Sequence, residues 1–188
     1  MSTQISLVGF TGSLREKSVN KGILRVVQEL LPAHVTMEIL TVGELPHYNL
    51  DLEADEPASV RNFKAKLRHA DAILIVTPEF NGSVPGVLKN ALDWASRPAG
   101  QSVMTGKLTA IAGAGGRGGT GSAQAHLRHI LKRFGVVVLE QPEVMIANSR
   151  EKFDHEGNLQ DEASRAQLSA LLSELLVAVQ TQTTTTVS

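Results

Sequence analysis

The chain contains no cysteine and no excess of charge of either sign. The absence of cysteine excludes disulfides, thiolate nucleophiles and thiolate metal sites, so any redox chemistry must come from a bound cofactor. The 18 basic and 19 acidic residues leave a formal net charge of -1. Because such a chain has no broad electrostatic field, nucleic acids and anionic membrane surfaces are disfavoured as partners.

Long apolar runs and two common catalytic motifs are also missing. No stretch reaches the length needed to span a membrane, and residues 1–4 lead into an expected strand without a charged region or an apolar leader. We therefore expect a cytoplasmic protein that does not insert into membranes. The chain has no Gly-x-x-x-x-Gly-Lys-Ser/Thr sequence and no Gly-x-Ser-x-Gly elbow, which excludes a nucleotide-triphosphate loop and the usual serine hydrolase nucleophile.

Five apolar runs alternate with five amphipathic patterns along the chain. The expected strands are residues 5–10, 35–40, 72–76, 108–112 and 136–139. The expected helices are residues 18–31, 57–70, 87–96, 122–134 and 161–179. Because parallel strands must be joined by a crossover, usually a helix, this alternation predicts a parallel sheet with helices on both faces.

This pattern predicts one domain over residues 1–179. A chain of 188 residues is long enough to bury one full core, and it shows no linker or internal repeat. Five strands fit the flavodoxin-like α/β class, a doubly wound sheet of order 2-1-3-4-5, although the order comes from the class and not from any residue. Residues 180–188 are polar and threonine-rich, so we expect a disordered tail.

The most informative segment, residues 77–94, joins a continuously apolar strand to a helix. Open parallel sheets bind ligands at the loops that follow the carboxyl ends of their strands. Pro78 and Pro85 stiffen this loop, while Glu79, Asn81 and Ser83 supply hydrogen-bonding groups. A rigid connector is the alternative, but the presence of further polar loops at the same edge favours a binding site.

The loop of residues 9–20 carries groups suited to a terminal phosphate. These groups are the Ser13 and Ser18 hydroxyls, the Arg15 guanidinium and the Asn20 amide, next to the start of a helix. A helix N-terminus favours an anion, and arginine adds a two-pronged donor. Alternatively, Ser18 is only the N-cap of the helix and Asn20 is solvated.

A third loop, residues 113–121, holds six glycines in nine residues. It contains Gly-x-Gly-x-x-Gly over residues 113–118, with Glu140 about twenty residues further on, so dinucleotide binding is a rival interpretation. Against this rival, the loop follows the fourth expected strand, and so many glycines favour room for a planar ring. A mobile surface loop is another alternative. Arg117 then either reaches a cofactor phosphate or extends into water.

The motifs within residues 12–20 and 78–94 resemble those of the NADPH-dependent FMN reductase family, and within it those of the bacterial quinone and chromate reductases. The resemblance covers residues 4–179, with 113–119 as a looser third element. It implies an FMN-dependent enzyme that passes hydride from NADPH or NADH through flavin N5 to quinones, and to chromate or other small oxidants. The residues implied to bind the cofactor are Ser13, Arg15, Ser18, Val19, Asn20, Pro78, Glu79, Phe80, Asn81, Gly82, Ser83, Gly115, Gly116, Arg117 and Gly118.

No side chain is expected to be catalytic, because the flavin carries the chemistry. Glu79 is the only carboxylate of its loop that is able to donate a proton, and we expect it instead to accept hydrogen bonds from nearby N–H groups. Tyr48 resembles a family residue near the mouth of the site, or it is a packing residue. His126 and His129 lie three residues apart, but basic neighbours favour a charged face over a metal site.

A flavodoxin-like electron carrier is the rival from a different class, although such carriers are usually strongly acidic. No residue is assigned to the 2'-phosphate that distinguishes NADPH from NADH. The resemblance also implies a homodimer or homotetramer with the helix of residues 87–96 at the contact. Leu88 and Leu92 form one apolar stripe while Trp94 projects elsewhere, so we expect Trp94 to lie at that contact.

Overall fold

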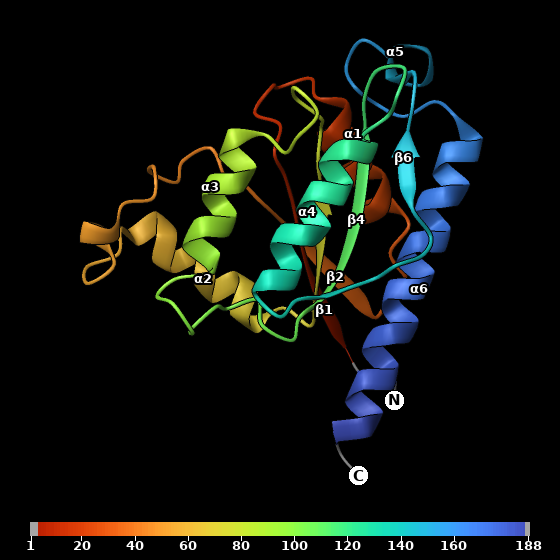
Figure 1. The fold of residues 1–188 in the computed structure, drawn as a ribbon. Helices are drawn as coiled ribbons and strands as arrows, with labels where there is room; N and C mark the ends of the chain where they lie inside the picture. The colour runs from red at the N-terminus through yellow and green to blue at the C-terminus, as the bar shows by residue number, and fades with distance from the viewer. Residues whose placement is uncertain (1–3, 187–188) are drawn as a thin grey trace.

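The computed structural model describes residues 4–186 and contains one parallel sheet. The strands run in the order β2-β1-β3-β4-β5, and β6 pairs with β4 beyond the end of β5. This order and the parallel pairing confirm the predicted flavodoxin-like class (Figure 1). The strand bounds are β1 Ile5–Thr11, β2 Val35–Leu40, β3 Ala72–Val76, β4 Leu108–Ala114, β5 Val137–Val138 and β6 Val144–Ile146.

Helices cover both faces of the sheet, because successive strand residues point to opposite sides. In β3, Leu74 packs with α1 and α6, whereas Ile73 and Ile75 pack with α2, α3 and α4. Figure 1 shows α6 along one face and these three helices on the other. The bounds are α1 Val19–Glu29, η1 Leu50–Leu52, α2 Ala58–His69, α3 Gly86–Ala95, α4 Gly121–Arg133, α5 Ser149–Lys152 and α6 Glu162–Thr186. No described helix has both the length and the apolar character required to cross a bilayer.

The predicted fifth strand over residues 136–139 is present as the shorter β5, Val137–Val138, but the sheet also has a sixth strand that was not predicted. The chain forms the short β5, passes Pro142, and then returns to the sheet as β6, which pairs Val144 with Ala112 and Ile146 with Ala114. Proline has no N–H to donate to a ladder, so it interrupts the pairing. As a result, β6 delivers one more loop to the carboxyl edge of the sheet.

The prediction of a disordered tail after residue 179 is wrong for the part that is described. Helix α6 continues to Thr186, and Gln182 donates a side-chain hydrogen bond to the Gly106 carbonyl at 3.4 Å. A polar segment lacks an apolar stripe of its own, but it can extend a helix that the preceding turns have already nucleated. Residues 187–188 of the predicted tail lie outside the described residues.

The expectation that Trp94 lies at a subunit contact is wrong. Leu88, Leu92 and Trp94 are all fully buried in the core between the sheet and α2 to α4. The Trp94 indole N–H donates to the Pro46 carbonyl at 2.8 Å, and the Tyr48 ring meets the indole edge-on at 5.2 Å between centroids. The segment that follows β2 therefore covers the side of α3 that the sheet leaves open.

Gly22 is expected to be essential for the packing of α1. A Cβ at this position would overlap the Gly157 carbonyl oxygen, whereas a Cβ at Gly86, also helical, would meet no atom within 4 Å. Overpacking costs about 1–3 kcal/mol, so Gly22→Ala should lower the melting temperature by about 2–10 °C. Gly86→Ala should leave it unchanged or raise it, since alanine favours helix. Thermal unfolding followed by circular dichroism tests this, and equal melting temperatures for the two variants would contradict the packing argument.

Candidate functional site

Four strand-to-helix loops meet at the carboxyl edge of the sheet and enclose a cavity of about 510 Å³. The loops follow β1, β3, β4 and β6, and they lie together at the upper edge in Figure 1. This volume falls within the range of about 300–1,000 Å³ that is typical of small-molecule sites. The lining residues are Ser13, Arg15, Ser18, Val19, Asn20, Pro78, Glu79, Phe80, Ala114, Gly115, Gly116, Arg117, Asn148, Ser149, Arg150 and Glu151.

The loop after β1 presents hydroxyls and one cation at the start of α1. The Ser18 Oγ accepts a hydrogen bond from the Asn20 N–H at 3.2 Å, so this serine caps the helix and also lines the cavity. The Thr11 Oγ1 accepts from the Ser13 N–H at 3.2 Å and shapes the turn. In the described part of the chain, the buried Ser13 hydroxyl and the exposed Arg15 guanidinium make no hydrogen bond. These two groups are therefore available to an anion.

Asn20 joins the loop after β1 to strand β4. Its side-chain Nδ2 donates to the Ala114 carbonyl at 3.0 Å, and its Oδ1 accepts from the Ala114 N–H at 2.9 Å. Both halves of the buried amide are thus used by the backbone of β4. Asn20 lines the cavity, but its side chain holds two loops together. This role differs from the two that the sequence suggested, phosphate binding and a solvated side chain.

The loop after β3 contains a tight hairpin turn with Asn81 and Gly82 at its centre. Phe80 and Ser83 exchange two backbone hydrogen bonds of 3.0 Å, and the residues between them have positive φ, 52° at Asn81 and 72° at Gly82. A turn with two positive φ angles is favoured by an Asn-Gly pair. The hairpin tip leaves Phe80 56% exposed. Asn81, Gly82 and Ser83, which the sequence assigned to the site, do not line the cavity.

Two contacts fasten this hairpin to α4. The Glu79 Oε2 accepts from the Ala123 N–H at 2.9 Å, in the first turn of a helix whose Thr120 makes no side-chain cap. This contact agrees with the structural role that we expected of Glu79. The Ser83 Oγ lies 2.7 Å from the His126 Nδ1. In the described residues, no three histidine or carboxylate side chains are grouped to hold a metal ion.

The glycine loop after β4 is hydrogen-bonded and closely packed. The Asn148 and Ser149 N–H groups donate to the Gly116 and Gly115 carbonyls at 2.9 and 3.0 Å. A Cβ at Gly115 would overlap the Gly119 carbonyl oxygen, whereas Gly116 has open space. The loop thus presents bare backbone on one side, although Gly118, another predicted site residue, does not line the cavity.

The geometry disfavours the dinucleotide fingerprint. Its first glycine, Gly113, lies within β4, where a Cβ would overlap the Thr77 carbonyl oxygen. This glycine allows β4 to pack closely on the segment after β3, which is different from opening a phosphate-binding turn. Glu140, the proposed ribose partner, does not line the cavity.

Sequence reasoning missed the segment of residues 148–151. Asn148, Ser149, Arg150 and Glu151 follow β6 and complete the cavity wall. The signal was present, because an apolar run at residues 144–146 precedes these polar residues. A sheet that ends with the expected strand at residues 136–139 places no strand, and so no loop, at this position.

Tyr48 belongs to the packing around α3 and does not line the cavity. Its hydroxyl donates to the Glu53 Oε1 at 2.6 Å, and the Arg97 guanidinium lies 5.4 Å from the centre of its ring. The hydrogen bond to Glu53, together with burial, raises the pKa of the Tyr48 phenol above its ordinary value. A phenol that stays protonated and engaged in this way supports the packing interpretation.

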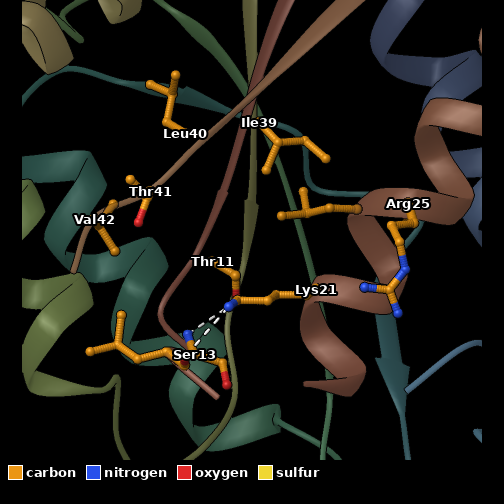
Figure 2. Close-up of a pocket in the computed structure, with 10 residues that line it drawn as sticks. Thr11, Ser13, Lys21, Arg25, Ile39, Leu40, Thr41 and Val42 are labelled. Carbon is orange, nitrogen blue, oxygen red and sulfur yellow. Dashed lines mark hydrogen bonds between the residues drawn. The ribbon is translucent and has the colours of Figure 1, made fainter. Parts of the chain in front are cut away.

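A second hollow of about 300 Å³ adjoins the first and shares Ser13 with it (Figure 2). It lies between the carboxyl ends of β1 and β2 and the side of α1. Figure 2 shows Lys21 reaching toward the loop after β1, where its Nζ donates to the Leu14 carbonyl at 3.4 Å. Arg25 donates to the Gly157 carbonyl at 3.0 Å and to the Asn158 Oδ1 at 2.9 Å. Both cations of this hollow are therefore engaged by the protein itself.

The chain is similar in sequence and in structure to known oxidoreductases. A sequence model of the NADPH-dependent FMN reductase family matches residues 5–151. The 2-hydroxy-1,4-benzoquinone reductase of a Burkholderia species is 42% identical over 93% of this chain and 94% of that protein. An NAD(P)H-dependent FMN reductase of Pseudomonas aeruginosa is 43% identical over 93% and 95%. The structure of a flavoenzyme NAD(P)H:(acceptor) oxidoreductase from Paracoccus denitrificans matches with a TM-score of 0.83 and 36% identity over 94% and 98%.

Removal of the Asn20 amide should destabilise the protein before any ligand is bound. Asn20→Ala leaves the buried N–H and C=O of Ala114 without partners, at a cost of about 1–3 kcal/mol for each. The exposed Asn62 provides the matched control, because Asn62→Ala should change stability by less than about 0.5 kcal/mol. Urea unfolding of the ligand-free protein, followed by the fluorescence of the single Trp94, measures both variants. Equal midpoints would show that the Asn20 amide does not join the two loops.

Proposed function

The chain belongs to the NADPH-dependent FMN reductase family, and we propose that it is an oxidoreductase that carries electrons from NADPH or NADH through FMN to quinones. The observation that carries this proposal is the cavity at the carboxyl edge of the sheet. There, the Ser13 hydroxyl and the Arg15 guanidinium, which have no partner among the described residues, come from the loop before α1 and share the cavity with the open backbone of Gly116. An anion-binding end next to a bare backbone surface fits the phosphate and the flat ring of a flavin mononucleotide.

The names of the relatives support a quinone as the electron acceptor. Besides the benzoquinone reductase, a quinone reductase of Pseudomonas putida is 41% identical over 86% of this chain and 88% of that protein. Chromate and other small oxidants are further proposed acceptors, because an open flavin face passes electrons to many of them. Net charge argues against the rival electron carrier, since a formal charge of -1 provides little field for docking a basic partner protein.

We propose that Ser13, Arg15 and Ser18 bind the FMN phosphate together with the first turn of α1. The N-terminus of a helix carries partial positive charge and presents N–H groups, and the guanidinium adds a charge-assisted pair of donors. Val19 borders the same end of the cavity. Asn20 acts indirectly in this proposal, because its bonds to Ala114 hold the phosphate end at a fixed place relative to the glycine loop.

Pro78, Phe80 and the backbone of residues 115–117 are proposed to border the flavin ring. When bound, FMN supplies the two-electron redox chemistry between nicotinamide and acceptor. The chain's part is to orient the ring and to leave one face open, and no side chain is proposed as a proton donor. The Glu79 carboxylate is occupied by the Ala123 N–H, which suits it to holding the hairpin in place.

A homodimer or homotetramer in the cytoplasm remains part of the proposal. Trp94 is buried, so the support for an assembly comes from other side chains beside the cavity. Leu14 and Phe80 are 57% and 56% exposed, and large exposed apolar groups beside a ligand site are often covered by a partner. A second copy of the chain is the partner that the family resemblance suggests.

The redox proposal makes a direct spectroscopic prediction. The purified protein should be yellow, and mass spectrometry of the released cofactor should find FMN. Anaerobic addition of NADPH should bleach the oxidised flavin absorption without any partner protein, and 1,4-benzoquinone should restore it. Release of FAD would be incompatible with this function, and bound FMN that NADPH leaves oxidised would favour the electron carrier.

Arg15→Gln should weaken FMN binding by about ten- to a hundredfold. This range corresponds to the loss of about 1.5–3 kcal/mol from a charge-assisted hydrogen bond to phosphate. Arg68 is an exposed arginine on α2 that is not part of the cavity lining, so Arg68→Gln is the matched control and should bind FMN normally. Fluorescence titration of the ligand-free proteins with FMN gives both dissociation constants. An unchanged constant for Arg15→Gln would remove Arg15 from the phosphate site.

A further inference from the structure

The cavity has more unpaired arginines than one flavin phosphate needs. Arg15 comes from the loop after β1, Arg117 from the glycine loop and Arg150 from α5. Within residues 4–186, none of these three guanidinium groups forms an ion pair or a hydrogen bond. Arg15 belongs to the proposed phosphate end, which leaves Arg117 and Arg150 without an anion.

The two remaining arginines come from other loops of the cavity than Arg15. The phosphate loop follows β1, whereas Arg150 follows β6, and β3 and β4 lie between these strands in the sheet. The backbones that carry Arg117 and Arg150 are joined by the hydrogen bonds from Asn148 to Gly116 and from Ser149 to Gly115. These bonds hold the backbone that carries Arg117 next to the backbone that carries Arg150.

We propose that Arg150, with Arg117 beside it, binds the 2'-phosphate of NADPH and makes the enzyme prefer NADPH to NADH. This inference rests on the proposed function, since it concerns the electron donor of that reaction. The 2'-phosphate is the one chemical difference between the two donors, and arginine is the side chain best suited to bind a phosphate with two parallel N–H groups.

The acidic residues of the cavity increase the effect that we expect from loss of Arg150. Glu79 is engaged by the Ala123 N–H, so its charge is already offset by the start of α4. Glu151 lines the same wall as Arg150, and its carboxylate repels a phosphate but not the ribose hydroxyl of NADH. Loss of Arg150 therefore removes an attraction and leaves this repulsion uncompensated, and both changes act more strongly on NADPH, which carries the additional phosphate.

The second hollow is the other place where cations adjoin the cofactor site, and its cations are less available. Arg25 is held by the Gly157 carbonyl and the Asn158 side chain, and Lys21 donates to the Leu14 carbonyl (Figure 2). A phosphate there would have to displace these contacts. Arg150 has no such contact to break.

Steady-state kinetics of the FMN-loaded enzyme with both donors test the proposal. Arg150→Gln should lower kcat/KM for NADPH by about tenfold, the effect of one charge-assisted contact at an exposed site. The value for NADH and the dissociation constant for FMN should stay within about twofold of wild type. Arg133→Gln, at an exposed position near the end of α4, removes the same charge and should change nothing. Arg117→Gln should act in the same direction as Arg150→Gln and more weakly.

Calorimetry supplies a readout that does not depend on turnover. Adenosine 2',5'-bisphosphate should bind the FMN-loaded wild-type protein more tightly than adenosine 5'-monophosphate, and Arg150→Gln should abolish the difference. If that difference is present while neither nicotinamide is oxidised, the proposed function fails and the phosphate site stands.

Three results would overturn the inference. An equal loss for NADPH and NADH in Arg150→Gln would assign the arginine to the pyrophosphate that both donors share. A weakened FMN constant in the same variant would assign it to the flavin phosphate. A fall in NADPH preference in Lys21→Gln, with Arg150→Gln unaffected, would place the 2'-phosphate in the second hollow.

Discussion

Parallel pairing of the strands is the constraint on which the rest of this structure depends. A crossover follows each of β1 to β4 and returns the chain to the start of the next strand, and β5 leads directly into β6 alongside β4, so β1 to β4 and β6 end at the same edge of the sheet. The loops after β1, β3, β4 and β6 are far apart in the sequence but meet there around one cavity. The site therefore follows from the topology, and its chemistry follows from which polar residues occupy those four loops.

Contacts between loops convert this convergence into a defined shape. Asn20 ties the loop after β1 to Ala114, Glu79 ties the hairpin after β3 to α4, and Asn148 ties the segment after β6 to Gly116. Each contact uses a backbone group that would otherwise lack a partner. Polar residues at such a site thus serve two purposes, since some of them face the ligand and others hold the loops that do.

The division between these purposes explains where sequence reasoning about the site succeeded and where it did not. The chemistry of Ser13 and Arg15 predicts an anion site, and both groups line the cavity without a partner among the described residues. The chemistry of Asn20 and Ser83 predicts ligand binding in the same way, yet their side chains contact Ala114 and His126. A hydroxyl or an amide has the same pattern in a sequence whichever partner it meets, so its role depends on packing.

The amino-acid sequence by itself determined the fold class, the alternation of strands and helices and the three segments of residues 9–20, 77–94 and 113–121 that contain the loops of the site. Hydrophobic periodicity and glycine or proline placement are local properties, and local properties can be read without coordinates. Only the tertiary structure decided that Trp94 is buried beneath the segment after β2, that the last strand is divided, and that Arg150 joins the cavity. These outcomes depend on contacts between distant parts of the chain, because burial and pairing are set by whichever element arrives alongside.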